Sequence, residues 1–302
     1  MSIRRTPYAE LPAALVDELA AAGLDPARVY AMVVDAFEED LPGGALDATG
    51  SAVPRMGHGT GGFVAREAGV VAGLAIAELA FVYALGDEGE VSGRVADGTH
   101  VSPGDTVLTV AGPLGDLLTA ERTALNVACH LSGVATATSH WVRALEGTGA
   151  RVLDTRKTLP GWRALQKYAV RCGGGLNHRF SLVDRAMVKD NHVVAAGGVV
   201  PAYRAVVAAH PDLRVEVEVT DLDQLRELLA VGCAEILLDN MDAATMAEAV
   251  RVTAGRAVLE ASGGLTLERA REVAETGVDL ISVGALTHSV TVFDLGLDLQ
   301  ED

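Results

Sequence analysis

Cysteine is scarce in this sequence, with three residues among 302. Cys129, Cys172 and Cys233 are odd in number and lack metal-ligand spacing. A disulfide framework and a cysteine metal centre are therefore not expected. Each cysteine is predicted to be a small core residue, and a reducing cytoplasm is the expected compartment.

Long apolar runs are also missing. The most apolar stretch, Val70–Leu85, is short for a membrane span and contains Glu78, so it is predicted to be a buried helix. Arg4 and Arg5 near the start are not followed by an apolar segment, which argues against a signal peptide. A membrane partner is therefore not expected.

Positive charge is in short supply. The chain has 24 Lys+Arg against 41 Asp+Glu, a net charge of −17. Binding to nucleic acid or to an anionic membrane would need a basic face, so neither partner is expected. The hydrophobic fraction of 49% argues against disorder, and the length suits one large or two ordinary domains.

Lysine is rarer still, and all of it lies in one basic segment, residues 154–192. This segment carries eight cationic side chains and three carboxylates, a net charge of +5. A lysine among arginines suggests the need for a compact point charge. The segment therefore predicts a site for a small anion. A solvated helix face is the alternative; it suits Lys167 and Arg171 but not Lys189, which follows the apolar residues Ala186–Val188.

The first third of the chain predicts an α+β domain, followed by a helical region. Helical spacing of apolar residues over 12–39, broken at Gly23 and Pro26, predicts two helices. Residues 41–62 are expected to form a loop, and 64–74 and 90–110 to form strands. Residues 113–146 are expected to be helical, with a split near Ser132-Gly133.

After Gly149, strands alternate with helices. This order predicts parallel βα units, in a closed or nearly closed barrel, with a doubly wound sheet as the alternative. The expected strands are Arg151–Asp154, Ala186–Lys189, Leu213–Val219, Glu235–Asp239, Ala257–Ser262 and Leu280–Val283.

Carboxylates gather at the ends of these strands. The alternation in Val215–Val219 puts Glu216 and Glu218 on one face, where a barrel would point both into its mouth. Asp239 ends the next strand, and Glu260 shares a face with Ser262. Carboxylates near lysines and arginines predict Mg²⁺ bound between the protein and a polyphosphate. The alternative is that the glutamates form plain structural ion pairs with the basic segment.

Two glycine turns follow the last two expected strands. They are Ser262-Gly263-Gly264, expected to precede a helix at Leu265, and Val283-Gly284-Ala285. Backbone N–H groups at such turns bind phosphate, and the last two units of a βα barrel are a usual phosphate site. Together the turns predict phosphate binding.

With these residues laid out, the chain resembles the quinolinate phosphoribosyltransferase family. The resemblance runs from about Val64 to the C-terminus, whereas Gly43–Gly62 departs from the family pattern and the first residues look like an extension. The matching motifs are REAGVVAGL from Arg66, AERTALN from Ala120, LSGVATAT from Leu131, DTRKTLPGWRALQKYAVRCGGGLNHR from Asp154, KDNH from Lys189, EVEV from Glu216, LLDN from Leu237, ASGG from Ala261 and VGALTHS from Val283.

The resemblance implies a fold, a reaction and an assembly. The fold is an N-terminal α/β sandwich over residues 1–130, rejoined by 289–302, beside an incomplete βα barrel over 131–288. The reaction transfers phosphoribosyl from phosphoribosyl pyrophosphate to quinolinate with decarboxylation, giving nicotinate mononucleotide, CO₂ and pyrophosphate for NAD synthesis, with Mg²⁺ as cofactor. The assembly is a homodimer with shared active sites, with further association left open.

The resemblance also implies roles for individual residues. Lys157, Lys189, Glu218 and Asp239 would be catalytic, and Glu218 and Asp239 would hold Mg²⁺ with the pyrophosphate. The residues implied to bind the two quinolinate carboxylates are Arg156, His178, Arg179 and Lys189, with Arg122 from the neighbouring chain. Those implied around phosphate are Ser262, Gly263, Gly264, Gly284 and His288.

Three alternatives remain open from sequence. One is a related transferase acting on another base, such as nicotinate or a molybdenum-linked substrate, although a dicarboxylate better explains five candidate cations. A second is a Schiff-base lyase, because Lys189 at a barrel strand end is also how an aldolase presents its lysine. A third is a nucleotide-binding or metabolic sensor without turnover.

Overall fold

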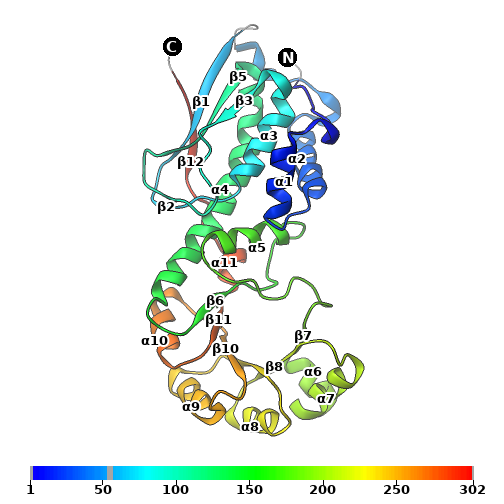
Figure 1. Cartoon of the computed structure of the whole chain (residues 1–302), viewed down its shortest axis with the longest axis vertical. Coiled ribbons are helices and arrows are strands. Elements are labelled where there is room, and N and C mark those ends of the chain that lie inside the picture. Colours follow the sequence, from blue (N-terminus) through cyan, green and yellow to red (C-terminus); the bar gives the residue numbers. More distant parts are fainter. Residues whose placement is uncertain (1–2, 53–56, 301–302) are drawn as a thin grey trace. The chain divides into compact units, whose positions relative to one another are not determined.

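The computed structural model describes residues 3–52 and 57–300, and the chain divides into two units (Figure 1). The first unit is formed within Met1–Ala137, Ala164–Gly173 and Val290–Asp302. The second comprises Thr138–Arg163 and Gly174–Ser289. The predicted boundary between residues 130 and 131 lies inside helix α4 (Leu114–Ala144), which supplies residues to both units.

An antiparallel sheet forms the frame of the first unit. Strand β12 (Leu295–Leu299) pairs with β1 (His58–Ala65), so the C-terminal strand belongs to this unit. A short separate pair joins β2 (Gly69–Val70) to β4 (His100–Val101). The main sheet has the spatial order β12 (Leu295–Leu299), β1 (His58–Ala65), β5 (Thr106–Pro113) and β3 (Glu90–Ser92).

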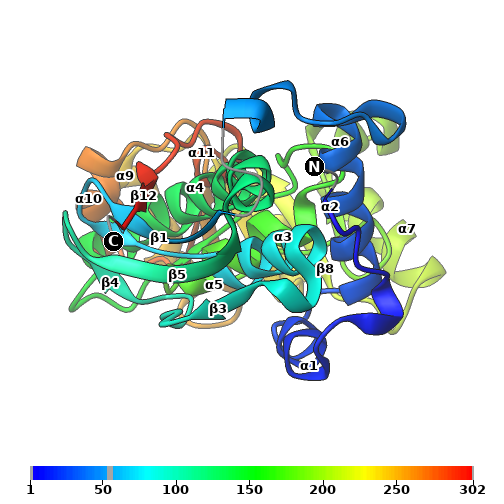
Figure 2. The ribbon, with the colours of Figure 1, turned by 90° about the horizontal axis from the view of Figure 1, so that it is seen from above.

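Helix α3 (Leu74–Leu85) is the core element of this unit. It contacts β3 and β5 on one side and α1 (Ala13–Ala21) and α2 (Pro26–Asp40) on the other (Figure 2). Because it is covered on both sides, ten of its twelve residues are buried. The predicted buried helix is thereby confirmed over α3, and the two predicted N-terminal helices are confirmed as α1 and α2. The unit also contains α5 (Arg163–Cys172) and the 3₁₀ turns Tyr8–Glu10, Pro42–Gly44, Ala48–Ala52 and Gly86–Glu88.

The loop predicted over residues 41–62 and the strand predicted over 64–74 were placed wrongly. Strand β1 already begins at His58, and residues 53–56 lie outside the described residues. Three glycines in β1 lower its intrinsic strand preference, which hid it in the sequence. Pairing with β5 on one edge and β12 on the other stabilises it instead.

The split predicted near Ser132-Gly133 was also wrong, because α4 continues through it. A Cβ atom at Gly133 would lie 2.2 Å from the carbonyl oxygen of Thr291. This glycine therefore permits the close passage of the C-terminal segment rather than breaking the helix.

The solvated face predicted for Lys167 was wrong as well. Lys167 lies on α5 with 0% of its surface exposed, whereas Arg171 on the same helix is exposed. The Arg171 guanidinium donates a hydrogen bond to the carbonyl oxygen of Ala22 and lies 5.7 Å from the centre of the Tyr168 ring. The burial of Lys167 shows that the rarity of lysine marks more than one kind of site.

Six parallel strands form the sheet of the second unit, and all six predicted strand segments are confirmed. Their order follows from parallel pairing, and the edge strands β6 and β7 are not paired with each other among the described residues. The sheet is therefore open at that point, as the incomplete barrel requires. The spatial order is β6 (Arg151–Leu153), β11 (Leu280–Ser282), β10 (Val258–Ser262), β9 (Glu235–Asp239), β8 (Val215–Val219) and β7 (Ala186–Val188).

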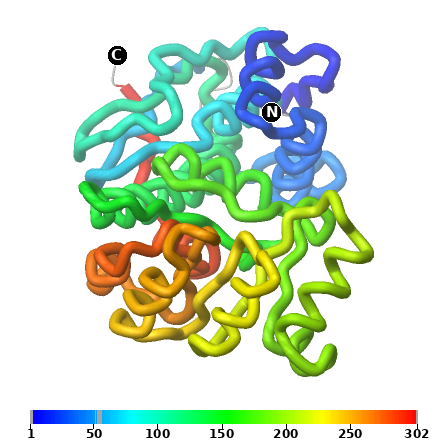
Figure 3. The backbone as a smooth tube through the Cα atoms, turned by 60° about the horizontal axis from the view of Figure 1, so that its bottom comes forward, coloured from blue at the N-terminus to red at the C-terminus, as the bar shows by residue number. Residues whose placement is uncertain are grey.

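Helices line the outside of this sheet. Neighbouring helices contact one another in chain order, and Figure 3 shows them as an arc from yellow-green through yellow to orange. They are α6 (Asp190–Ala196), α7 (Val199–Ala209), α8 (Leu222–Ala230), α9 (Ala243–Thr253) and α10 (Ala270–Glu275), with a 3₁₀ turn at Leu267–Arg269 and the short α11 (Ala285–His288) after β11.

Two expectations from composition can be compared with the fold. All three cysteines are free; Cys129 and Cys233 are buried, and Cys172 is partly exposed. In the described part of the chain no single helix has the length and apolarity to cross a membrane, although the bent pair α6 and α7 meets that test jointly.

We expect Gly133→Ala to lower the free energy of unfolding by about 1–3 kcal/mol, because the added methyl group has no space beside Thr291. Gly115→Ala is the matched control on the same helix, since a Cβ there meets nothing within 4 Å. It should leave stability unchanged or raise it by up to about 1 kcal/mol. Urea unfolding of both variants measures the difference, and equal stability would contradict the close approach.

Candidate active site

A cavity of about 700 Å³ lies at the carboxyl ends of the strands in the second unit. Polar residues converge there because parallel strands bring their carboxyl ends to one edge. Arg122 is the one predicted site residue outside the second unit. The predicted site residues that line the cavity are Arg156, Lys157, His178, Arg179, Lys189, Glu218, Asp239, Ser262, Gly263, Gly264, Gly284 and His288.

The strand register explains this convergence. Asp239 and Ser262 end neighbouring strands and are paired directly in the β9–β10 ladder. Glu218 lies one residue before the end of β8, and Lys189 follows β7 directly. Lys189 is exposed, and its backbone N–H donates to Nδ1 of His192 at 2.9 Å. The lysine side chain thus leaves the sheet at the rim of the cavity rather than within a helix face.

Two carboxylates lie together at this rim. Burial, and then the negative charge of Asp239, raise the pKa of Glu218 above its usual value, although Lys189 acts in the opposite direction. Two neighbouring carboxylates of this kind form a site suited to a cation. Their oxygen atoms are the ligands that Mg²⁺ prefers.

Two arginines form a cationic region of the cavity. Burial, and then the charge of Arg156, lower the pKa of Arg179. The Nε atom of Arg156 is buried without a hydrogen-bond partner, and Arg156 has no ion pair among the described residues. Cationic groups that face each other in this way are suited to an anion with more than one charged oxygen.

The turn after β10 requires glycine. Gly263 has a φ of +98°, and a Cβ atom there would lie 2.8 Å from the backbone nitrogen of Asn240. The helix expected at Leu265 begins later, as the 3₁₀ turn at Leu267–Arg269. The turn therefore keeps its backbone close to Asn240 at the cavity wall.

The turn after β11 has a different reason for glycine. A Cβ at Gly284 would lie 2.9 Å from Cδ of Lys157 and 3.0 Å from Nε2 of His288. Both side chains therefore cross directly over this residue. The Thr287 hydroxyl donates to the carbonyl oxygen of Lys157 at 2.7 Å and holds that backbone in place.

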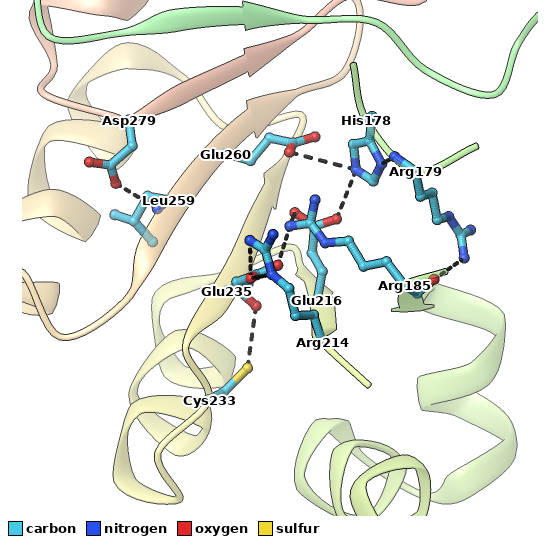
Figure 4. A network of polar contacts seen from close by, with 10 residues as sticks. All are labelled: His178, Arg179, Arg185, Arg214, Glu216, Cys233, Glu235, Leu259, Glu260 and Asp279. Atoms are coloured by element: carbon cyan, nitrogen blue, oxygen red, sulfur yellow. Dashed lines mark hydrogen bonds and ion pairs between the residues drawn. The ribbon is translucent and has the colours of Figure 1, made fainter. Parts of the chain in front are cut away.

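A buried ionic cluster lies beside the cavity (Figure 4). Glu216 is 1% exposed; its carboxylate accepts from Nε2 of His178 at 3.0 Å and from Arg185 at 3.2 Å. Arg185 also pairs with Glu235, which in turn pairs with Arg214. Glu216 therefore does not open into the mouth as predicted. It forms structural ion pairs, and only Glu218 of the two glutamates lines the cavity.

Asp154 and Asn177 hold the segment that carries His178 and Arg179. Asp154 is fully buried and accepts from the backbone N–H of His178 at 2.8 Å and from Nδ2 of Asn177 at 2.6 Å. The Arg179 guanidinium is held separately by the carbonyl oxygen of Arg185 at 3.0 Å. Sequence reasoning assigned no role to Asp154 or Asn177, although Asp154 closes the first expected strand of the second unit.

The hydrogen bonds of His178 define its tautomer. Nδ1 accepts the backbone N–H of Arg179 at 2.7 Å, so the ring proton lies on Nε2, which faces Glu216. His178, Glu216 and Glu260 place potential metal-ligand atoms within 4.8 Å of one another, but the protonated Nε2 makes this a hydrogen-bonded cluster. Glu218 and Asp239 remain the better cation site.

Arg122 lies on the part of α4 that belongs to the first unit. Its side chain is 65% exposed and pairs with Glu121 at 3.0 Å.

The ionic cluster generates a stability prediction. We expect Arg185→Met to cost about 3–5 kcal/mol, because it leaves Glu216 buried without its cation. Arg214→Met is the control: its side chain is 70% exposed and its loss should cost less than about 1 kcal/mol. Denaturant unfolding compares the two, and similar losses would show that Arg185 has no special structural role.

Comparison with known proteins identifies two matching domains. Residues 47–132 match the family described as quinolinate phosphoribosyl transferase, N-terminal domain, and residues 134–298 match the corresponding C-terminal domain. Together these matches include all the predicted site residues.

Individual relatives agree with this result. The nicotinate-nucleotide pyrophosphorylase [carboxylating] of Mycobacterium leprae is 52% identical over 268 residues, which cover 87% of this chain and 94% of the relative. A probable enzyme of the same name from Bacillus subtilis is 42% identical, over 78% of this chain and 82% of the relative. The nicotinate-nucleotide pyrophosphorylase structure from Francisella tularensis is 36% identical with a TM-score of 0.86, covering 90% of this chain and 96% of that one. On its sequence, its fold and the order of its motifs, the chain belongs to the quinolinate phosphoribosyltransferase family.

Proposed function

We propose that this chain catalyses the reaction for which its relatives are named. It transfers phosphoribosyl from phosphoribosyl pyrophosphate to quinolinate and releases CO₂, pyrophosphate and nicotinate mononucleotide, a step of de novo NAD synthesis. The observation that carries the proposal is the cavity, which brings together two arginines, an acidic pair and two glycine turns. The arginines match the two carboxylates of quinolinate, and the glycine turns and the acidic pair match the phosphorylated donor.

The arginines supply the base-binding wall. Arg156 and Arg179, with Lys189 at the end of β7, bind the two carboxylates of quinolinate and turn the ring nitrogen towards the donor sugar. His178 is proposed to share this contact, and both of its ring nitrogens have partners in the protein. Holding these two mutually repelling anions in the reactive orientation lowers the activation barrier of the transfer by several kcal/mol, on the order of the contribution expected from positioning alone.

The opposite wall binds the donor. Ser262, Gly263 and Gly264 offer backbone groups to phosphate, and Lys157 and His288 cross Gly284 towards the same anion. As pyrophosphate departs, the sugar gains positive charge at its anomeric carbon. The carboxylates of Glu218 and Asp239 stabilise that charge, and the protein needs no covalent nucleophile.

Mg²⁺ is part of the proposal. The residues present fit it, because Glu218 lies beside Asp239, and burial and the charge of Asp239 raise the pKa of Glu218 even though Lys189 acts in the opposite direction. Glu218 and Asp239 would hold the ion together with pyrophosphate oxygens. When bound, Mg²⁺ neutralises charge on the leaving pyrophosphate.

A homodimer completes the proposal. The exposed Arg122 is the remaining cation of the implied quinolinate site and is proposed to enter the cavity of a partner subunit. The cytoplasm is the proposed compartment, in keeping with three free thiols.

The rival functions predict other outcomes. A nicotinate transferase needs fewer cations than the cavity provides. A Schiff-base lyase would trap substrate on Lys189 with borohydride, and a sensor would bind ligands without turnover.

The test is a turnover assay with quinolinate, phosphoribosyl pyrophosphate and Mg²⁺, with nicotinate as parallel substrate. We expect equal amounts of CO₂ and pyrophosphate from quinolinate, and loss of both when Mg²⁺ is chelated. Activity with nicotinate alone would overturn the assignment of the base.

Mixing two inactive variants tests the shared site. Arg122→Ala and Lys189→Ala should each lower turnover by at least about 100-fold without unfolding, because both side chains are exposed. Mixed and re-equilibrated, they should recover about a quarter of the wild-type rate, since half the dimers would then hold one intact site. Each variant mixed with itself is the control. No recovery would contradict a site shared between subunits.

A further inference from the structure

Glu260 is a buried acid that has no role in the substrate binding or phosphoribosyl transfer proposed above. It lies on β10, is 1% exposed and nevertheless lines the cavity. Neither of its carboxyl oxygens has a hydrogen-bond partner. Nε2 of His178 lies 3.7 Å from Oε2 of Glu260 (Figure 4). A buried polar group without a hydrogen-bond partner lowers the stability of the fold, so its presence calls for an explanation.

Charge balance indicates that Glu260 is neutral. In the adjacent cluster, Arg185 and Arg214 compensate Glu216 and Glu235, so two cations meet two anions. Among the described residues no lysine or arginine forms an ion pair with Glu260. A further negative charge would stay uncompensated in a buried site.

The electrostatics agree with this count. Burial, and then the negative charge of Glu216, raise the pKa of Glu260 well above its usual range. A carboxylic acid with a raised pKa is suited to donate a proton.

The proposed reaction requires such a proton. When the 2-carboxylate of the ribosylated ring leaves as CO₂, the electron pair of the broken C–C bond stays on ring carbon C2. The adjacent pyridinium nitrogen stabilises it. Protonation at C2 as the C–C bond breaks traps this electron pair before CO₂ can recombine with the ring, and it gives nicotinate mononucleotide. No other group of the cavity has been assigned this step.

We propose that Glu260 is the acid that protonates C2, so that decarboxylation is completed on the enzyme. This inference rests on the proposed function. The new C2–H bond takes its proton from the Glu260 carboxyl group, whose O–H bond breaks and leaves a carboxylate. The pyridinium product offsets that negative charge while it remains in the cavity. Water returns the proton to Glu260 once the product has left.

The variant Glu260→Gln separates proton donation from hydrogen bonding, because the amide still donates a hydrogen bond but has no acidic proton. In a single turnover with quinolinate labelled in its 2-carboxylate, the wild type should release CO₂ and pyrophosphate together. The variant should release pyrophosphate within about tenfold of the wild-type rate and CO₂ at least about 100-fold more slowly. The ribosylated dicarboxylate should accumulate and be recovered after acid quench.

Glu235→Gln is the matched control. It is a buried carboxylate of the adjacent cluster that does not line the cavity. Even if it is less stable, it should release CO₂ and pyrophosphate in equal amounts at all times. A lag in CO₂ with this variant would attribute the effect to disturbance of the cluster and overturn the role of Glu260.

The remaining outcomes are also decisive. Simultaneous release of both products by Glu260→Gln, at the wild-type rate or with both slowed equally, would overturn proton donation. Failure of the proposed function looks different, because the wild type itself would then release neither product from quinolinate.

Discussion

Parallel pairing of six strands is the constraint on which the active site depends. Each strand of the second unit ends at the same edge, and the direct pairing of Asp239 with Ser262 places an acid of one strand beside the phosphate turn of the next. A shift of register by one residue would turn Glu218 towards the other face of the sheet. The backbone hydrogen bonding between strands therefore determines which side chains can line the cavity.

Within this unit, charged side chains in the buried cluster form ion pairs, whereas several of those at the cavity wall do not. In the buried cluster, Arg185 compensates Glu216 and Glu235, and Glu260 lies beside His178 without an ion pair to a lysine or arginine among the described residues. At the cavity wall the opposite holds, since Arg156 lacks an anion and Glu218 lies beside another acid. Compensated charges stabilise the unit, and uncompensated charges are available to substrates.

The first unit has its own constraint in helix α4. The helix continues past Gly133, where the absence of a side chain lets the C-terminal segment pass close by. That segment leads into β12, which pairs with β1 in the same unit. The same helix displays Arg122 to the outside. One element thus links the packing of this unit to the proposed partner subunit.

The sequence by itself determined the strand order along the chain, the parallel class of the second unit and twelve of the residues that line its cavity. These follow from local patterns: period-two alternation, apolar segments, glycine turns and specific motifs. Only the tertiary structure decided which similar residues differ in role. Glu216 and Glu218 alternate identically, yet one meets Arg185 and the other the cavity. Lys167 and Lys189 share a basic segment, yet one is buried and the other exposed. The strand β1 and the unbroken α4 escaped prediction because both depend on partners distant in the chain, and a local pattern carries no information about such partners.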